Sequence, residues 1–125
     1  MKGLLNPNFE PIIKIGLIID NKIKSFNAII DTGFNGFISI PHKIIKQTSW
    51  QFIGYEAYEL ASGETMKDKV YLGDILFCKQ KLYTYILANK TDDILIVTKQ
   101  FANKILTINF KKKEMIENKI DSIYK

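Results

Sequence analysis

The sequence predicts an all-β fold, a closed or nearly closed β-barrel with one or two short helices, in a single domain of residues 1–125. Three observations support this prediction. Apolar and polar residues alternate with a period of two along most of the chain, no sustained helical stripe interrupts them, and turn residues recur about every 6–12 positions. A chain of 125 residues also suits one compact domain.

In the N-terminal half, alternation predicts two strands joined by a hairpin turn at Asp20-Asn21, followed by a short strand that Pro41 ends. Pro41 suits the first turn of a short helix, because its missing N–H would be unpaired there in any case. The expected strands are residues 11–18, 23–30 and 37–40, and the expected helix covers 41 to about 47.

In the C-terminal half, a turn at Ser62-Gly63-Glu64 separates two further strands, and Gly73-Asp74 is expected to interrupt the chain. Thr98 is the expected N-cap of one or two helical turns over residues 98–104. A final hairpin surrounds Lys111-Lys112-Lys113. The strands expected here are residues 50–60, 65–72, 75–78, 82–88, 94–97, 105–110 and 114–117.

Composition and charge narrow the function classes. The hydrophobic content of 46% and the charged content of 25% are those of a soluble globular protein. The apolar runs have strand length, and the first residues lack the apolar core of a signal peptide, so we expect a cytoplasmic protein without a membrane span. The net charge is +5, but all 18 basic residues are lysines, scattered apart from Lys111-Lys112-Lys113, which disfavours a nucleic-acid partner.

Alternating aromatic residues between Trp50 and Tyr58 could stack on bases, but in a strand they favour packing. No cofactor or metal site is expected, because no cluster of ligands with local spacing is visible. Cys78 lies in an apolar context typical of a buried thiol, and nothing in the sequence favours a dyad with His42, the one histidine.

The segment with the clearest chemistry is Asp31-Thr32-Gly33, which follows an apolar strand directly. A strand end can hold a carboxylate in a defined place, Thr32 offers a hydroxyl, and Gly33 permits a tight backbone turn. The same three residues would also suit an ordinary turn. The tripeptide is therefore a weak signal by itself.

Its context resembles the small prokaryotic retropepsin-like aspartic proteases along nearly the whole chain. Three segments carry the resemblance: 30–36 with Asp31-Thr32-Gly33, 60–64 with Ala61-Ser62-Gly63, and 95–101. The resemblance implies an acid-protease β-barrel in which Asp31 is catalytic, Thr32 and Gly33 form the active-site turn, and Ala61, Ser62 and Gly63 form a flap over a peptide or protein substrate. Val97 stands where the family has a glycine, which puts the geometry of the catalytic turn in question.

Acid–base hydrolysis needs one group that accepts a proton and one that donates it. Two carboxylates about 3 Å apart share one proton, as in the aspartic-protease dyad. This chain has one Asp-Thr-Gly segment and is too short for two lobes, so the resemblance implies a homodimer with Asp31 of each protomer at the two-fold axis.

The sequence also allows other interpretations of the function. Val97 and the basic charge would suit a catalytically inactive barrel that serves as a binding or regulatory module. An RNA-binding barrel is a further alternative, which steeply salt-dependent oligonucleotide binding would reveal. Asp92-Asp93 is a rival acidic pair, but adjacent strand residues point to opposite faces, and in a polar loop such residues more often cap a turn.

Overall fold

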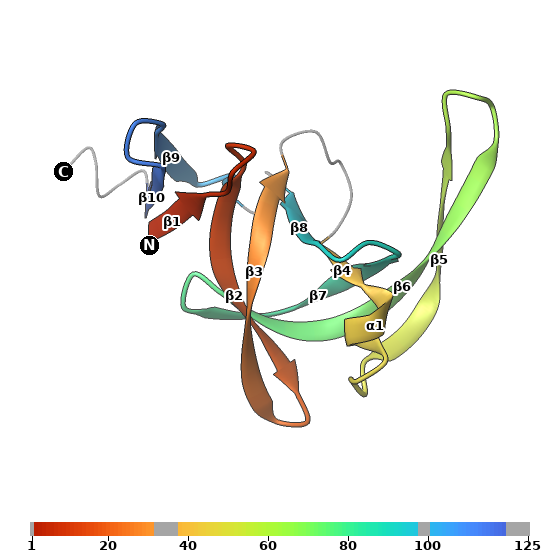
Figure 1. Ribbon diagram of the computed structural model, residues 1–125. Helices are drawn as coiled ribbons and strands as arrows, with labels where there is room; N and C mark the ends of the chain where they lie inside the picture. Colours follow the sequence, from red (N-terminus) through yellow and green to blue (C-terminus); the bar gives the residue numbers. More distant parts are fainter. Residues whose placement is uncertain (1, 32–37, 98–100, 120–125) are drawn as a thin grey trace.

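The computed structural model describes residues 2–31, 38–97 and 101–119 (Figure 1). Within these residues, six strands close into a barrel in the order β6-β7-β4-β8-β3-β2, because β2 also pairs with β6. The seam that closes the barrel pairs Gly16 with Leu76 and Leu17 with Ile75. The six strands are β2 (Pro11–Ile19), β3 (Lys22–Asp31), β4 (Ile38–Pro41), β6 (Thr65–Phe77), β7 (Gln80–Asn89) and β8 (Ile94–Val97).

The other elements extend the sheet on both sides of the barrel. β5 pairs with the first part of β6, and the two strands form a long hairpin that projects from the barrel (Figure 1). At the other end of the sheet, β1 pairs with β2 and β10, and β10 pairs with β9. These elements are β1 (Lys2–Leu5), β5 (Gln51–Glu59), β9 (Lys104–Asn109), β10 (Glu114–Lys119) and the helix α1 (His42–Ile45).

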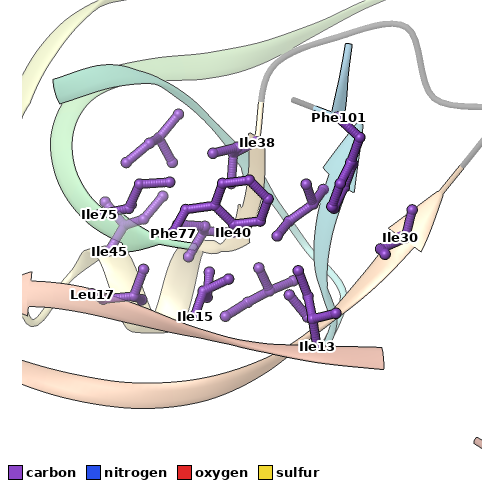
Figure 2. Close-up of a cluster of buried hydrophobic side chains, with 14 of the residues drawn as sticks. Ile13, Ile15, Leu17, Ile30, Ile38, Ile40, Ile45, Ile75, Phe77 and Phe101 are labelled. Atoms are coloured by element: carbon purple, nitrogen blue, oxygen red, sulfur yellow. The ribbon is translucent and has the colours of Figure 1, made fainter. Parts of the chain in front are cut away.

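Every second residue of the barrel strands points inward. In β2 the side chains of Ile13, Ile15 and Leu17 are at most 2% exposed. They meet aliphatic side chains from β3, β4, β6, β7 and β8. Figure 2 shows part of this cluster. Phe101 completes the cluster, with its ring edge-on to Phe77 at 5.2 Å between centroids. Burial of this aliphatic cluster is the main force that holds the barrel together.

The predicted fold class is confirmed, since the described residues form an all-β closed barrel with one short helix, α1. The hairpin turn at Asp20-Asn21 is also present, with φ of 51° and 63°. Asp and Asn tolerate this left-handed region better than most residues, which explains why the chain turns there. Among the described residues, no helix is long and apolar enough to cross a membrane.

Three expectations about elements need correction or lie beyond the described residues. Gly73-Asp74 does not interrupt the chain, because β6 continues through both residues to Phe77. At Gly73 a side chain would collide with Ile86 Cδ1 at 2.5 Å and Trp50 Cδ2 at 2.6 Å, so glycine serves packing rather than a turn. The strand β1 was not expected, and Thr98 lies outside the described residues.

Candidate active site

Asp31 is the last residue of β3, and the parallel register of β3 and β8 places it beside Val97, the last residue of β8. The two strands therefore end side by side, as Figure 1 shows. Asp31 is partly buried and interacts with its surroundings, which suits a carboxylate held in one position. Thr32 and Gly33 lie outside the described residues.

Strand alternation decides which way Asp31 faces. The preceding pair, Ile30 and Ile96, belongs to the core inside the barrel. Successive residues of a strand point to opposite faces, so Asp31 and Val97 lie on the outer face. Val97 is only 2% exposed there although it is not part of the core cluster.

A wall of aliphatic and small side chains continues from Asp31 along this outer face. Leu95 lies two residues before Val97, Ser39 pairs with both Leu95 and Leu87, and Leu87 pairs with Val70. Leu87 and Val70 are 7% and 6% exposed, and neither belongs to the core inside the barrel. The side chains on the outer face between Asp31 and β6 are therefore largely apolar and shielded from solvent, as those in the wall of a binding cleft would be.

The projecting β5–β6 hairpin carries the residues expected to form a flap. Ala61, Ser62 and Gly63 are exposed at its tip. There the Gly63 N–H donates to the Leu60 carbonyl at 2.9 Å, and the Leu60 N–H donates to the Glu64 carbonyl at 2.8 Å. Gly63 has a φ of 89°, which glycine adopts without strain. Figure 1 shows this tip well separated from the end of β3, so a single chain does not bring the tip to Asp31.

The paired strands of the β5–β6 hairpin have a polar contact, between Tyr58 and Asp68, on the same face as Val70. Tyr58 and Asp68 lie on the face that contains Gly54 and Val70, because these residues alternate along paired strands. The Tyr58 hydroxyl donates a hydrogen bond to the Asp68 carboxylate. Partial desolvation, the negative charge of Asp68 and this hydrogen bond all raise the pKa of Tyr58. Tyr58 therefore remains a protonated donor at any physiological pH.

Asn89 organises the polar loop beside the wall. Its side-chain amide donates to Ser39 Oγ at 2.7 Å and to the Asp93 carbonyl at 3.0 Å. Its side-chain oxygen accepts from the backbone N–H of Thr91 at 2.9 Å and from the Thr91 hydroxyl at 2.8 Å. One amide thus ties the loop to buried Ser39, in the middle of the wall. Sequence patterns had marked this loop only as polar.

We expect Asn89→Ala to lower the free energy of unfolding by about 1–3 kcal/mol, because it leaves Ser39 and the loop without their shared partner. Asp92→Ala is the matched control in the same loop, since Asp92 is exposed and pairs only at the surface. Urea denaturation of both variants would check the prediction. Equal, small effects of the two substitutions would contradict the role assigned to Asn89.

The rival acidic pair is not assembled as a catalytic couple. Asp92 forms a surface ion pair with Lys43, whose hydrogen bond and positive charge lower the pKa of Asp92. Asp93 instead contributes its backbone, since its carbonyl accepts from Asn89 and its N–H donates to the Thr91 hydroxyl at 3.1 Å. These residues shape a turn, as their position in a polar loop predicted.

Cys78 and His42 are not brought together either. Cys78 lies in the turn between β6 and β7, where burial raises the pKa of its thiol, and His42 begins α1. The two residues line different hollows of the surface. Over residues 2–31, 38–97 and 101–119, no group of three or more His, Cys, Asp and Glu side chains could hold a metal ion.

Comparison with known proteins identifies the architecture. No protein-family model matches the chain, and no curated protein sequence matches it. A solved structure does: the crystal structure of a retropepsin-like aspartic protease from Rickettsia conorii superposes with a TM-score of 0.62, covering 95% of this chain and 89% of that one. The chain has a retropepsin-like fold. With 16% sequence identity, the similarity shows the retropepsin-like fold and leaves the activity to be argued from the residues.

Proposed function

We propose that this chain is an aspartic endopeptidase that acts as a homodimer and hydrolyses peptide bonds with one Asp31 from each protomer. The observation that carries the proposal is the position of Asp31 at the paired ends of β3 and β8, on the outer face of a retropepsin-like barrel. A partly buried carboxylate at the end of an apolar wall is suitably placed to act on a bound peptide.

Two carboxylates in the dimer would divide the acid–base work. The ionised Asp31 takes a proton from a water molecule, whose oxygen attacks the scissile carbonyl carbon, while the protonated Asp31 of the second copy donates its proton to the carbonyl oxygen. The C–N bond then breaks as the leaving nitrogen takes up the proton held by the first carboxylate, and a hydroxyl group of the tetrahedral intermediate returns a proton to the second. Each carboxylate changes its protonation state twice, so the pair returns to its starting state.

In this proposal the other predicted site residues support substrate binding. Thr32 and Gly33 continue the chain directly from Asp31, where Thr32 braces the dimer axis and Gly33 lines the cleft. Ala61, Ser62 and Gly63 close over the peptide as the hairpin tip moves toward the cleft, a movement that the turn at the end of two unsupported strands permits. The substrate then lies extended between the hairpin and the wall.

One observation favours a second candidate function, a catalytically inactive barrel that binds a partner. Val97, at the position of the family glycine, is buried directly beside Asp31. A β-branched side chain there limits how the chain can turn after Asp31, and loss of the turn's geometry would remove catalysis while leaving a binding cleft.

Binding of a pepstatin-type inhibitor separates the two functions. The peptidase proposal predicts that the inhibitor raises the melting temperature and that the protein sediments as a dimer in its presence, because the inhibitor bridges both Asp31 carboxylates. At an inhibitor concentration of about 100 Kd, linkage gives roughly 2.7 kcal/mol of added stability. A monomer whose melting temperature does not change with inhibitor would refute the peptidase proposal and favour the binding module.

A further inference from the structure

A hollow of about 500 Å³ lies on the barrel surface at the seam between β2 and β6. Its lining comes from β2, β3, β6, the β6–β7 turn and β10. Surface sites for small molecules span roughly 300–1,000 Å³, so the size is appropriate for a ligand. Ser25 of the lining and Asp31 are six residues apart on β3, or roughly 20 Å along the strand. The hollow is therefore separate from the candidate active site.

Gly16 gives the hollow an apolar floor. A Cβ atom at this position would lie 2.9 Å from Ile23 Cγ2 and 3.1 Å from Leu76 Cβ. Glycine thus lets side chains from β3 and β6 close over the backbone of β2, on the outer side of the seam. The result is a continuous apolar surface that an aliphatic chain can cover.

The charges around the hollow are unevenly distributed. Glu117 of the lining forms an ion pair with Lys104 at 3.3 Å, and the two side chains are 7% and 9% exposed. The buried acid is therefore already neutralised by a buried base. Lys14 and Lys79 lie at the exposed rim, and no ion pair to either appears among the described residues. The groups that a ligand in the hollow would meet therefore have a net positive charge, from Lys14 and Lys79.

The turn that contains Lys79 has a backbone conformation that its two residues, Cys78 and Lys79, adopt unfavourably. Cys78 and Lys79 have φ of 50° and 64°, a region that disfavours side chains other than Asn, Asp and Gly. The corresponding turn between β2 and β3 uses Asp20-Asn21, which tolerate it. Strain of this kind often accompanies a functional position, and here the strained turn contains the rim lysine Lys79. Because burial raises the pKa of the Cys78 thiol, Cys78 adds no negative charge.

We propose that this hollow binds a small amphipathic anion, a carboxylic acid with a medium-length aliphatic chain. The aliphatic chain covers the floor formed by Gly16, Ile23 and Leu76, and the carboxylate lies between Lys14 and Lys79. The binding does not depend on the peptidase proposal, because no residue of the hollow belongs to the candidate active site.

Titration of the isotopically labelled full chain with octanoate, followed by NMR, tests the site. We expect octanoate to shift the backbone resonances of Gly16, Ser25 and Leu76 and to bind at least about fivefold more tightly than octan-1-ol or octylamine, which have the same chain with no charge or a positive charge. Binding of octylamine as tight as that of octanoate would overturn the proposal, since the lysines would then not select for a negative charge.

Charge reversal provides the decisive comparison. The double variant Lys14→Glu/Lys79→Glu should lose the preference for octanoate and bind octylamine more tightly instead. The control Lys111→Glu/Lys112→Glu changes the net charge equally in an exposed turn away from the hollow and should preserve the octanoate preference. An equal loss in both double variants would show that only the overall charge matters and would overturn the proposed site. Circular dichroism confirms that both variants remain folded.

Discussion

Asp31→Asn is expected to reduce the rate of peptide hydrolysis by about 10²–10⁴-fold, because asparagine can neither accept the proton of water nor donate one to the carbonyl oxygen. The two side chains have nearly the same shape, so the β3–β8 pairing and the stability should be retained. Turnover of a peptide library by purified wild type and variant measures the effect. Equal turnover would remove Asp31 from the mechanism.

Asp20→Asn is the matched control, since Asp20 is an exposed aspartate in the β2–β3 turn at the opposite end of β3. Its left-handed backbone conformation accommodates Asn, so activity and fold should both be unchanged. A comparable loss in this variant would point to a general charge effect instead of catalysis.

Mixing wild type with Asp31→Asn in equal amounts also tests the requirement for two copies. If only dimers with two intact carboxylates are active, random exchange leaves about one quarter of the dimers active. Independent monomers would retain about half of the activity. The mixture therefore reports on the dimer without any knowledge of its interface.

The second large effect is expected at the buried ion pair between Lys104 and Glu117. Lys104→Met should lower the free energy of unfolding by about 3–5 kcal/mol, because it removes the Lys104 charge from beside the buried Glu117 carboxylate. The pair joins the start of β9 to β10, so the loss should also loosen the hairpin that these strands form. Urea denaturation at neutral pH measures the change.

Two controls make this interpretation specific. Lys43→Met removes a lysine from an ion pair in the same way, but Lys43 and Asp92 are exposed, so stability should change little. The double variant Lys104→Met/Glu117→Leu replaces both buried charges by apolar groups and should recover most of the lost stability. If the double variant were as unstable as Lys104→Met, the damage would come from packing and not from the loss of the Lys104 charge beside Glu117.

The strands that bury one face were the most predictable part of this fold. Alternation placed the ends of β2 and β3 within one residue, because buried apolar positions alternate along them and the turn between them needs residues that accept positive φ. Gly73 misled the prediction, because glycine marks turns more often than it marks a close approach of two side chains across a sheet. Only the tertiary neighbours Ile86 and Trp50 distinguish the two cases.

The candidate site was predictable only in part. Asp31 could be proposed from its position after an apolar strand, but its pairing with Val97 depends on the parallel contact between strands that are far apart in the sequence. The same holds for the hydrogen bond between Asn89 and Ser39, which joins the end of β7 to β4, two strands far apart in the sequence. Local signals find the residues of a site, whereas long-range register determines which of them meet.

The seam between β2 and β6 also has a consequence for how the protein folds. The hairpins β2–β3 and β6–β7 join neighbouring stretches of chain, but the seam joins Gly16 and Leu17 to Leu76 and Ile75. Bringing such distant residues together costs loop-closure entropy before the contacts between them stabilise the structure. We therefore expect the hairpins to form early and the seam to form in the rate-limiting step, so that substitutions at this short junction slow refolding more than those in either hairpin.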